Sequence, residues 1–76
     1  DLSKELGLEY LEKAHEIAPD NLYNKMYLAE VLYDHKQYDR AETLLKEIIN
    51  TQEIVHDLAI DSFIKKQARD FLDKHY

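Results

Sequence analysis

The fold of this 76-residue chain is decided by residues 19–50, which read PDNLYNKMYLAEVLYDHKQYDRAETLLKEIIN. Two stretches of apolar residues at helical spacing flank the polar triplet at residues 35–37. Steps of three and four residues are typical of an amphipathic helix, whereas a half-buried strand alternates every second residue. We therefore predict one helix over residues 22–34 and another over residues 38–50, joined by a short connection.

Pro19 separates these two helices from an earlier one. The residue before a proline avoids the α region, so a helix that runs up to residue 18 must end here. Its apolar stripe consists of Leu8, Leu11, Ala14, Ile17 and Ala18. Asp20 or Asn21 can cap the following helix, because its side-chain oxygen can accept a bond from a free first-turn N–H. Gly7 costs the first helix roughly 1 kcal/mol relative to Ala, which is tolerated if another helix approaches closely.

The stretch from Thr51 to Asp61 is the hardest to interpret, because its apolar residues fit a helical period but no capping residue is decisive. One interpretation is a break near residues 58–62, with Asp61 or Ser62 capping a final helix. The apolar positions of that helix are Phe63, Ile64, Ala68, Phe71 and Leu72. The other interpretation is one long helix from Glu53 to His75. We expect the break, and in either case an all-α fold of about four helices.

Small side chains mark where the two central helices meet. Ala29 and Ala41 let antiparallel helices pack near the close end of the 8–10 Å interaxial range, and Tyr38 can fill the gap at the turn. Each helix pair leaves one apolar side uncovered, so neighbouring helices must stack on it.

These spacings resemble the tetratricopeptide repeat. Leu28-Ala29 matches the Leu–small pair of that family's first helix, and Tyr38-Asp39-Arg40-Ala41 resembles its Tyr-Asp-x-Ala signature. Leu45 and Ile48 follow at the family's spacing, and Gly7, Leu11 and Ala14 occupy the same three positions when counted back from Pro19. The resemblance implies a right-handed solenoid fragment of helical hairpins.

The resemblance also divides the chain into three parts within a single domain, residues 1–76. Residues 1–19 resemble the second helix of a preceding repeat, residues 20–53 a full repeat, and residues 54–76 a C-terminal capping segment. Because the chain starts at Asp1 and inside this pattern, we expect it to be a piece of something longer. The pattern is broken by Lys25, which stands where the family usually has an aromatic residue, and by the lack of a proline at residue 53.

Composition excludes several classes of protein. The chain has no Cys, one Gly, one Pro and a formal charge of -6 from 10 basic and 16 acidic residues. Disulfides, Cys-ligated zinc and Gly-rich phosphate loops are therefore ruled out, while the lack of Cys is compatible with several compartments. An acidic domain is poorly suited to nucleic acid or to anionic membranes, and no apolar run is long enough to insert into a membrane.

We find no signal for catalysis, a cofactor or a metal. The four histidines, at positions 15, 35, 56 and 75, lack the close spacing of metal ligands. Glu30 and Asp34 lie one helical turn apart, but as catalytic acids they would need a deep pocket. A solvated or partner-facing acidic stripe is the expected interpretation, so we predict that the chain is not an enzyme.

The resemblance implies instead a concave groove, lined by the first helix of the repeat, that binds a peptide or a helical segment of a protein. The positions that map to it are Tyr23, Met26, Tyr27, Glu30, Tyr33 and Asp34. Tyrosine suits interfaces because it combines a broad apolar ring with a hydroxyl, and Met adapts its shape to different ligands. We expect Tyr23 and Met26 to be exposed, while Tyr27 and Tyr33 can instead pack on flanking helices.

The expected partner is a basic or amphipathic protein segment, because the groove is acidic. One subgroup of the family grips a terminal carboxylate with Lys and Asn, and Met26 and Glu30 stand at those places, which disfavours that mode. An alternative role is structural, in which the segment caps a longer array or forms a homo-oligomer. The face for this role consists of Phe63, Ile64, Phe71 and Leu72.

Overall fold

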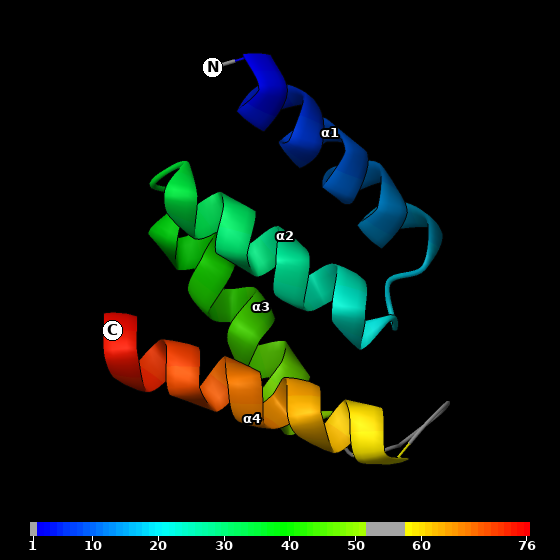
Figure 1. Cartoon of the computed structure of the whole chain (residues 1–76), viewed down its shortest axis with the longest axis vertical. Coiled ribbons are helices and arrows are strands. Elements are labelled where there is room, and N and C mark those ends of the chain that lie inside the picture. Colours follow the sequence, from blue (N-terminus) through cyan, green and yellow to red (C-terminus); the bar gives the residue numbers. More distant parts are fainter. Residues whose placement is uncertain (1, 52–57) are drawn as a thin grey trace.

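The computed structural model describes residues 2–51 and 58–76, which form four α-helices and no strand. The helices are α1 (Leu2–Ile17), α2 (Leu22–Asp34), α3 (Tyr38–Asn50) and α4 (Leu58–His75). They pack as successive hairpins. In Figure 1, α1 and α4 lie on opposite sides of α2, and α3 crosses behind α2 and α4. The predicted bounds of α2 and α3 are confirmed.

Asn21 begins α2, as the sequence suggests. Its Oδ1 accepts a hydrogen bond from the backbone N–H of Asn24 at 3.0 Å, and its own backbone is extended. A cap of this type stabilises a helix by about 1 kcal/mol. The Asn24 side chain in turn donates to the carbonyl of Ala14 at 3.4 Å, so the cap also joins α2 to α1.

The connection between α2 and α3 depends on an unusual backbone conformation. Lys36 has φ 64°, the left-handed region that glycine normally occupies. Its N–H donates to the Tyr33 carbonyl, and the N–H of Gln37 donates to the Leu32 carbonyl, both at 2.9 Å. These two bonds form a Schellman-type ending that reverses the chain within three residues.

The core lies where α2, α3 and α4 meet. Leu28, Leu32, Leu45, Ile48 and Ile64 are the largest fully buried side chains. Ala29 and Ala41 are 0% exposed, in agreement with close packing of α2 on α3. Between these two helices, Lys25 Nζ lies 3.5 Å from Glu47 Oε1, so Lys25 replaces the usual aromatic residue with an alkyl stem and an ion pair.

Helix α1 is joined to the rest of the molecule by α2 and by one ion pair. Arg40 donates two hydrogen bonds to the Glu12 carboxylate, at 2.9 and 2.8 Å. These bonds lower the pKa of Glu12 below its usual value. Because both side chains are largely solvated, the pair contributes less than about 1 kcal/mol.

The prediction for the last helix was wrong in one respect. Helix α4 already begins at Leu58, so neither Asp61 nor Ser62 caps it. Asp61 is only 8% exposed and lies on the same side of α4 as Ile64 and Ala68, so the packed face of α4 includes a residue of its first turn. The remainder of the alternative helix, residues 53–57, lies outside the described residues.

Two further expectations about packing need correction. A Cβ on Gly7 would meet no described atom within 4 Å, so no described helix makes the close approach that we expected there. Tyr38 does not fill an internal gap, because its side chain is 44% exposed. Its ring packs edge-on against Tyr33 at 4.8 Å, and its carbonyl accepts a 2.6 Å hydrogen bond from the Tyr76 hydroxyl.

Candidate functional site

A shallow pocket of about 230 Å³ lies between α2 and α4. The two helices run in the same direction, so successive turns of one lie beside successive turns of the other (Figure 1). Helix α2 contributes Met26 and Glu30, and α4 contributes Gln67, Asp70, Phe71, Lys74 and His75. We call this hollow the α2–α4 groove.

Met26 forms the floor of the groove and not its accessible wall. Its side chain is only 3% exposed, so the prediction that Met26 is exposed was wrong. The physical reason is the presence of α4, which covers the side of α2 that carries Met26 and Tyr33. No cap or spacing in the sequence indicates that α4 covers this side of α2.

Glu30 stands out electrostatically in the groove. Its Oε1 atom is buried and accepts no hydrogen bond from any described residue. Burial raises the pKa of Glu30, and the nearby Asp34 carboxylate raises it further. Lys74 lines the same pocket but forms no ion pair with Glu30 in the described structure. The Glu30 carboxylate is therefore a hydrogen-bond acceptor without a donor among the described residues.

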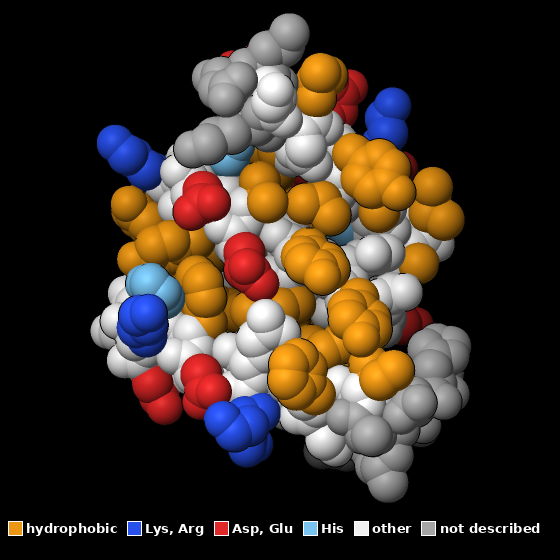
Figure 2. All heavy atoms as spheres, viewed as in Figure 1, with side chains coloured by type: hydrophobic (Ala, Val, Ile, Leu, Met, Phe, Trp, Pro, Cys, Tyr) orange, Lys and Arg blue, Asp and Glu red, His pale blue; other side chains and the backbone are white. Residues whose placement is uncertain are grey.

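Tyr23 and Tyr27 lie seven and three residues before Glu30, so they share its side of α2, and we call them the aromatic rim. Tyr23 and Tyr27 are 44% and 54% exposed, and their rings stack at 6.4 Å with an interplanar angle of 18°. On α4, Ile60 and Phe63 are exposed at the corresponding end of that helix. Figure 2 shows the result, in which orange side chains run across α2 towards α4 and red acidic side chains lie towards the C-terminal end of α2.

Tyr33 is a structural residue and not part of the accessible surface of the groove. Its ring contacts Phe71 edge-on at 5.3 Å and His75 at 5.0 Å, besides Tyr38 and Tyr76. This cluster holds the C-terminal end of α4 against α2 and closes one end of the groove. Asp34 follows Tyr33 and is exposed, so it adds negative charge at that end.

The α4 wall of the groove was not anticipated from the sequence. Phe63, Gln67, Asp70 and Lys74 follow one another at steps of four, three and four residues, which places them on one side of α4. This spacing was visible in the sequence, but it becomes meaningful only when α4 is known to lie beside α2. Asp70 is already paired with Lys66 at 2.9 Å, so Glu30 is the acidic residue lining the groove that has no basic partner among the described residues.

The four residues proposed for self-association do not form one exposed face. Ile64 is 1% exposed and belongs to the core, which contradicts its assignment to a contact surface. Phe71 and Leu72 are half-buried against that core, and only Phe63 is largely exposed. The stripe that we identified in the sequence is the inner side of α4.

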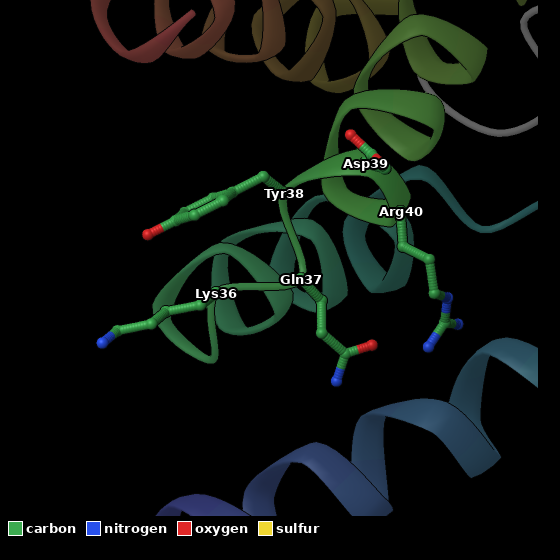
Figure 3. Close-up of a pocket in the computed structure, with 5 residues that line it drawn as sticks. All are labelled: Lys36, Gln37, Tyr38, Asp39 and Arg40. Carbon is green, nitrogen blue, oxygen red and sulfur yellow. The ribbon is translucent and has the colours of Figure 1, made fainter.

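A second hollow, of about 240 Å³, lies at the turn between α2 and α3. It is lined by the consecutive residues 36–40. In Figure 3, Gln37 and Arg40 point towards α1, whereas Lys36 and Tyr38 point away from them. Because its side chains diverge and Arg40 is already bound to Glu12, this hollow lacks the converging groups of a binding site.

The described residues contain no group of three or more His, Asp or Glu side chains that could hold a metal ion. None of their helices is long and apolar enough to cross a membrane.

Comparison with known proteins gives one match. The family model described as tetratricopeptide repeat matches residues 7–53, which is more than half of the chain. No curated protein and no solved structure matches the chain.

Proposed function

This chain belongs to the tetratricopeptide repeat family, whose members are generally protein–protein interaction modules, and we propose that its α2–α4 groove binds a segment of a partner protein. The family is usually non-catalytic, and no enzyme family matches the chain. Within it, we assign residues 1–19 to the second helix of one repeat, residues 20–53 to a full repeat and residues 54–76 to a capping segment. The boundary between residues 53 and 54 lies outside the described residues.

Glu30 is the observation that carries this proposal. A half-buried carboxylate whose oxygen has no donor lowers the stability of the fold, since burying an unsatisfied polar group is unfavourable. Residues that weaken the fold in this way are expected at functional sites. A basic group from a partner, held between α2 and α4, would supply the missing donor.

The aromatic rim determines the rest of the expected ligand. Tyr23 and Tyr27 present stacked rings, and Phe63 presents a largely exposed ring on α4. Large aromatic side chains with little conformational entropy to lose are common anchors for protein ligands. The groove therefore favours a peptide or helical segment that carries an apolar residue beside Tyr23 and a basic residue beside Glu30.

The alternative role, a structural cap that self-associates through α4, has less support. Of its four candidate residues, only Phe63 is largely exposed, so a contact made there would bury little apolar surface. We therefore retain the groove as the proposed working surface.

Replacing Glu30 by Gln should change stability and binding in opposite directions. The folded state raises the pKa of Glu30, so at pH 7 the ionised carboxylate opposes folding, and this effect disappears as the pH falls through the raised pKa. In the Gln variant, the free energy of unfolding at pH 7 should rise by about 1 kcal/mol or less, and this pH dependence should be lost. When the variant is used to select binders from a displayed library of random 12-residue peptides, the selected peptides should contain fewer basic residues than those selected by the wild type.

Urea denaturation at pH 7 and pH 4, together with library selection, measures both effects. Glu16→Gln is the matched control, because Glu16 is an exposed carboxylate on α1 and its loss should leave both properties unchanged. The proposal is contradicted if Glu30→Gln destabilises the protein, or if the variant and the wild type select the same peptides.

A further inference from the structure

The pocket in the α2–α4 groove has hydrogen-bond acceptors on both of its walls. Glu30 lies on the α2 wall, and Gln67 and Asp70 lie on the α4 wall. Because α2 and α4 lie side by side, these groups border one open space of about 230 Å³ (Figure 1). Gln67 and Asp70 are exposed, whereas Oε1 of Glu30 is buried and has no donor among the described residues. A ligand that satisfies both walls must therefore donate hydrogen bonds in more than one direction.

Two rings line the same pocket. The ring centroids of Phe71 and His75 are 4.3 Å apart, and their planes meet at 40°. Phe71 is half-buried and contacts the Tyr33 ring edge-on at 5.3 Å, so its position is fixed by packing. A cation is attracted to the face of an aromatic ring, and arginine is found there more often than lysine. The pocket thus offers an apolar surface for a flat cation beside its acceptors.

A lysine of the chain itself borders this pocket without satisfying Glu30. Lys74 lines the pocket together with Glu30, but no ion pair joins the two in the described structure. Lys66 pairs with Asp70 at 2.9 Å, where both side chains are largely exposed. An ammonium is a compact and strongly hydrated charge, whereas a guanidinium is more weakly hydrated and loses less when it leaves water. A half-buried carboxylate therefore favours a guanidinium as its partner.

We infer that this pocket receives an arginine side chain of the partner segment and that it selects arginine over lysine. A guanidinium carries five N–H groups in one plane, so it can donate to Glu30 on α2 and to Gln67 on α4 at the same time. Its plane can also lie on the Phe71 ring. The inference rests on the proposed function, because it names the side chain that enters the groove beside Glu30.

Substitutions in a bound peptide test this selectivity. A peptide selected from the 12-residue library would be synthesised with arginine, lysine or citrulline at each basic position in turn, and its affinity would be measured by fluorescence anisotropy. The lysine form should bind about tenfold more weakly than the arginine form. Citrulline has the shape of arginine without its charge, so the citrulline form should bind more weakly still.

Variants of the protein locate the selectivity in the pocket. Gln67→Ala removes one acceptor and should reduce the preference for arginine over lysine to about threefold or less. Glu30→Gln should bring the affinities of the arginine and citrulline forms much closer together, because the charged partner is lost. Gln37→Ala is the matched control, since Gln37 is also exposed but lies at the turn between α2 and α3. Circular dichroism checks that each variant keeps its helicity.

A preference for arginine that Gln67→Ala lowers and Gln37→Ala leaves intact would support the inference. Equal affinities for the arginine and lysine forms would overturn it, as would a preference that Gln67→Ala leaves unchanged. In either case the proposed function still stands if Tyr23→Ala and Glu30→Gln weaken binding. Selected peptides without a basic residue, or binding that neither variant weakens, would overturn the proposed function and the inference together.

Discussion

Replacing Leu45 by Ala is expected to lower the free energy of unfolding by about 2–5 kcal/mol. Leu45 is 0% exposed on α3 and belongs to the core formed with α2 and α4. A domain of 76 residues has a total stability of roughly 4–11 kcal/mol, so this single change removes a large part of it. The variant should be partly unfolded near physiological temperature.

Urea denaturation followed by circular dichroism measures this loss. Lys46→Ala is the matched control on the same helix, because Lys46 is exposed and its ion pair with Glu42, at 3.6 Å, is solvated. The control should change stability by less than about 0.5 kcal/mol. If Leu45→Ala cost no more than this control, α3 could not be packed as described.

The second large effect concerns binding. The double variant Tyr23→Ala with Glu30→Lys should weaken the capture of a library-selected peptide by about 100-fold or more. The first change removes an aromatic anchor, and the second places a positive charge where the partner's basic group is expected. Helicity should be unchanged, because Tyr23 is 44% exposed and Glu30 does not belong to the core.

Fluorescence anisotropy with the labelled peptide provides the measurement. Glu16→Lys is the control for charge, since it makes the same change on α1, outside the groove. It should reduce affinity far less than the double variant. Peptide capture that survives the double variant would show that the working surface lies elsewhere.

The sequence was sufficient to predict α2 and α3 to the residue. Their boundaries are set by local chemistry, namely Pro19, the Asn21 cap and the polar triplet at residues 35–37. Signals of this kind act within a few residues of the helix ends, so they can be identified before any tertiary contact is known.

Tertiary packing determined what the sequence could not. Helix α4 begins at Leu58, before either of the caps that the sequence suggested, and Ile64 and Ala68 hold it in the core. Lys36 adopts a left-handed conformation that its residue type does not suggest. The packing of α4 follows from contacts between distant parts of the chain, which a single sequence does not specify, whereas the Lys36 conformation completes the local hydrogen bonds that end α2.

The binding role of the candidate residues stays a prediction, and only their burial can be compared with the structure. Tyr23 and Tyr27 are exposed on α2 and Glu30 lines the groove, whereas Met26 forms its buried floor and Tyr33 packs into an aromatic cluster. The apolar stripe of α2 is too wide for one neighbouring helix to cover, which indicates two neighbours. It does not show which residues the second neighbour buries. The α4 wall remained unidentified for the same reason.

Chemical-shift mapping tests the central claim, that the α2–α4 groove is the binding surface. ¹⁵N-labelled protein would be titrated with the library-selected peptide, and the shifts of backbone amides would be followed. We predict that the largest shifts fall on residues 23–34 of α2 and residues 63–75 of α4, with little change on the solvent side of α3. Largest shifts on α3, or at the turn of residues 36–40, would contradict the account.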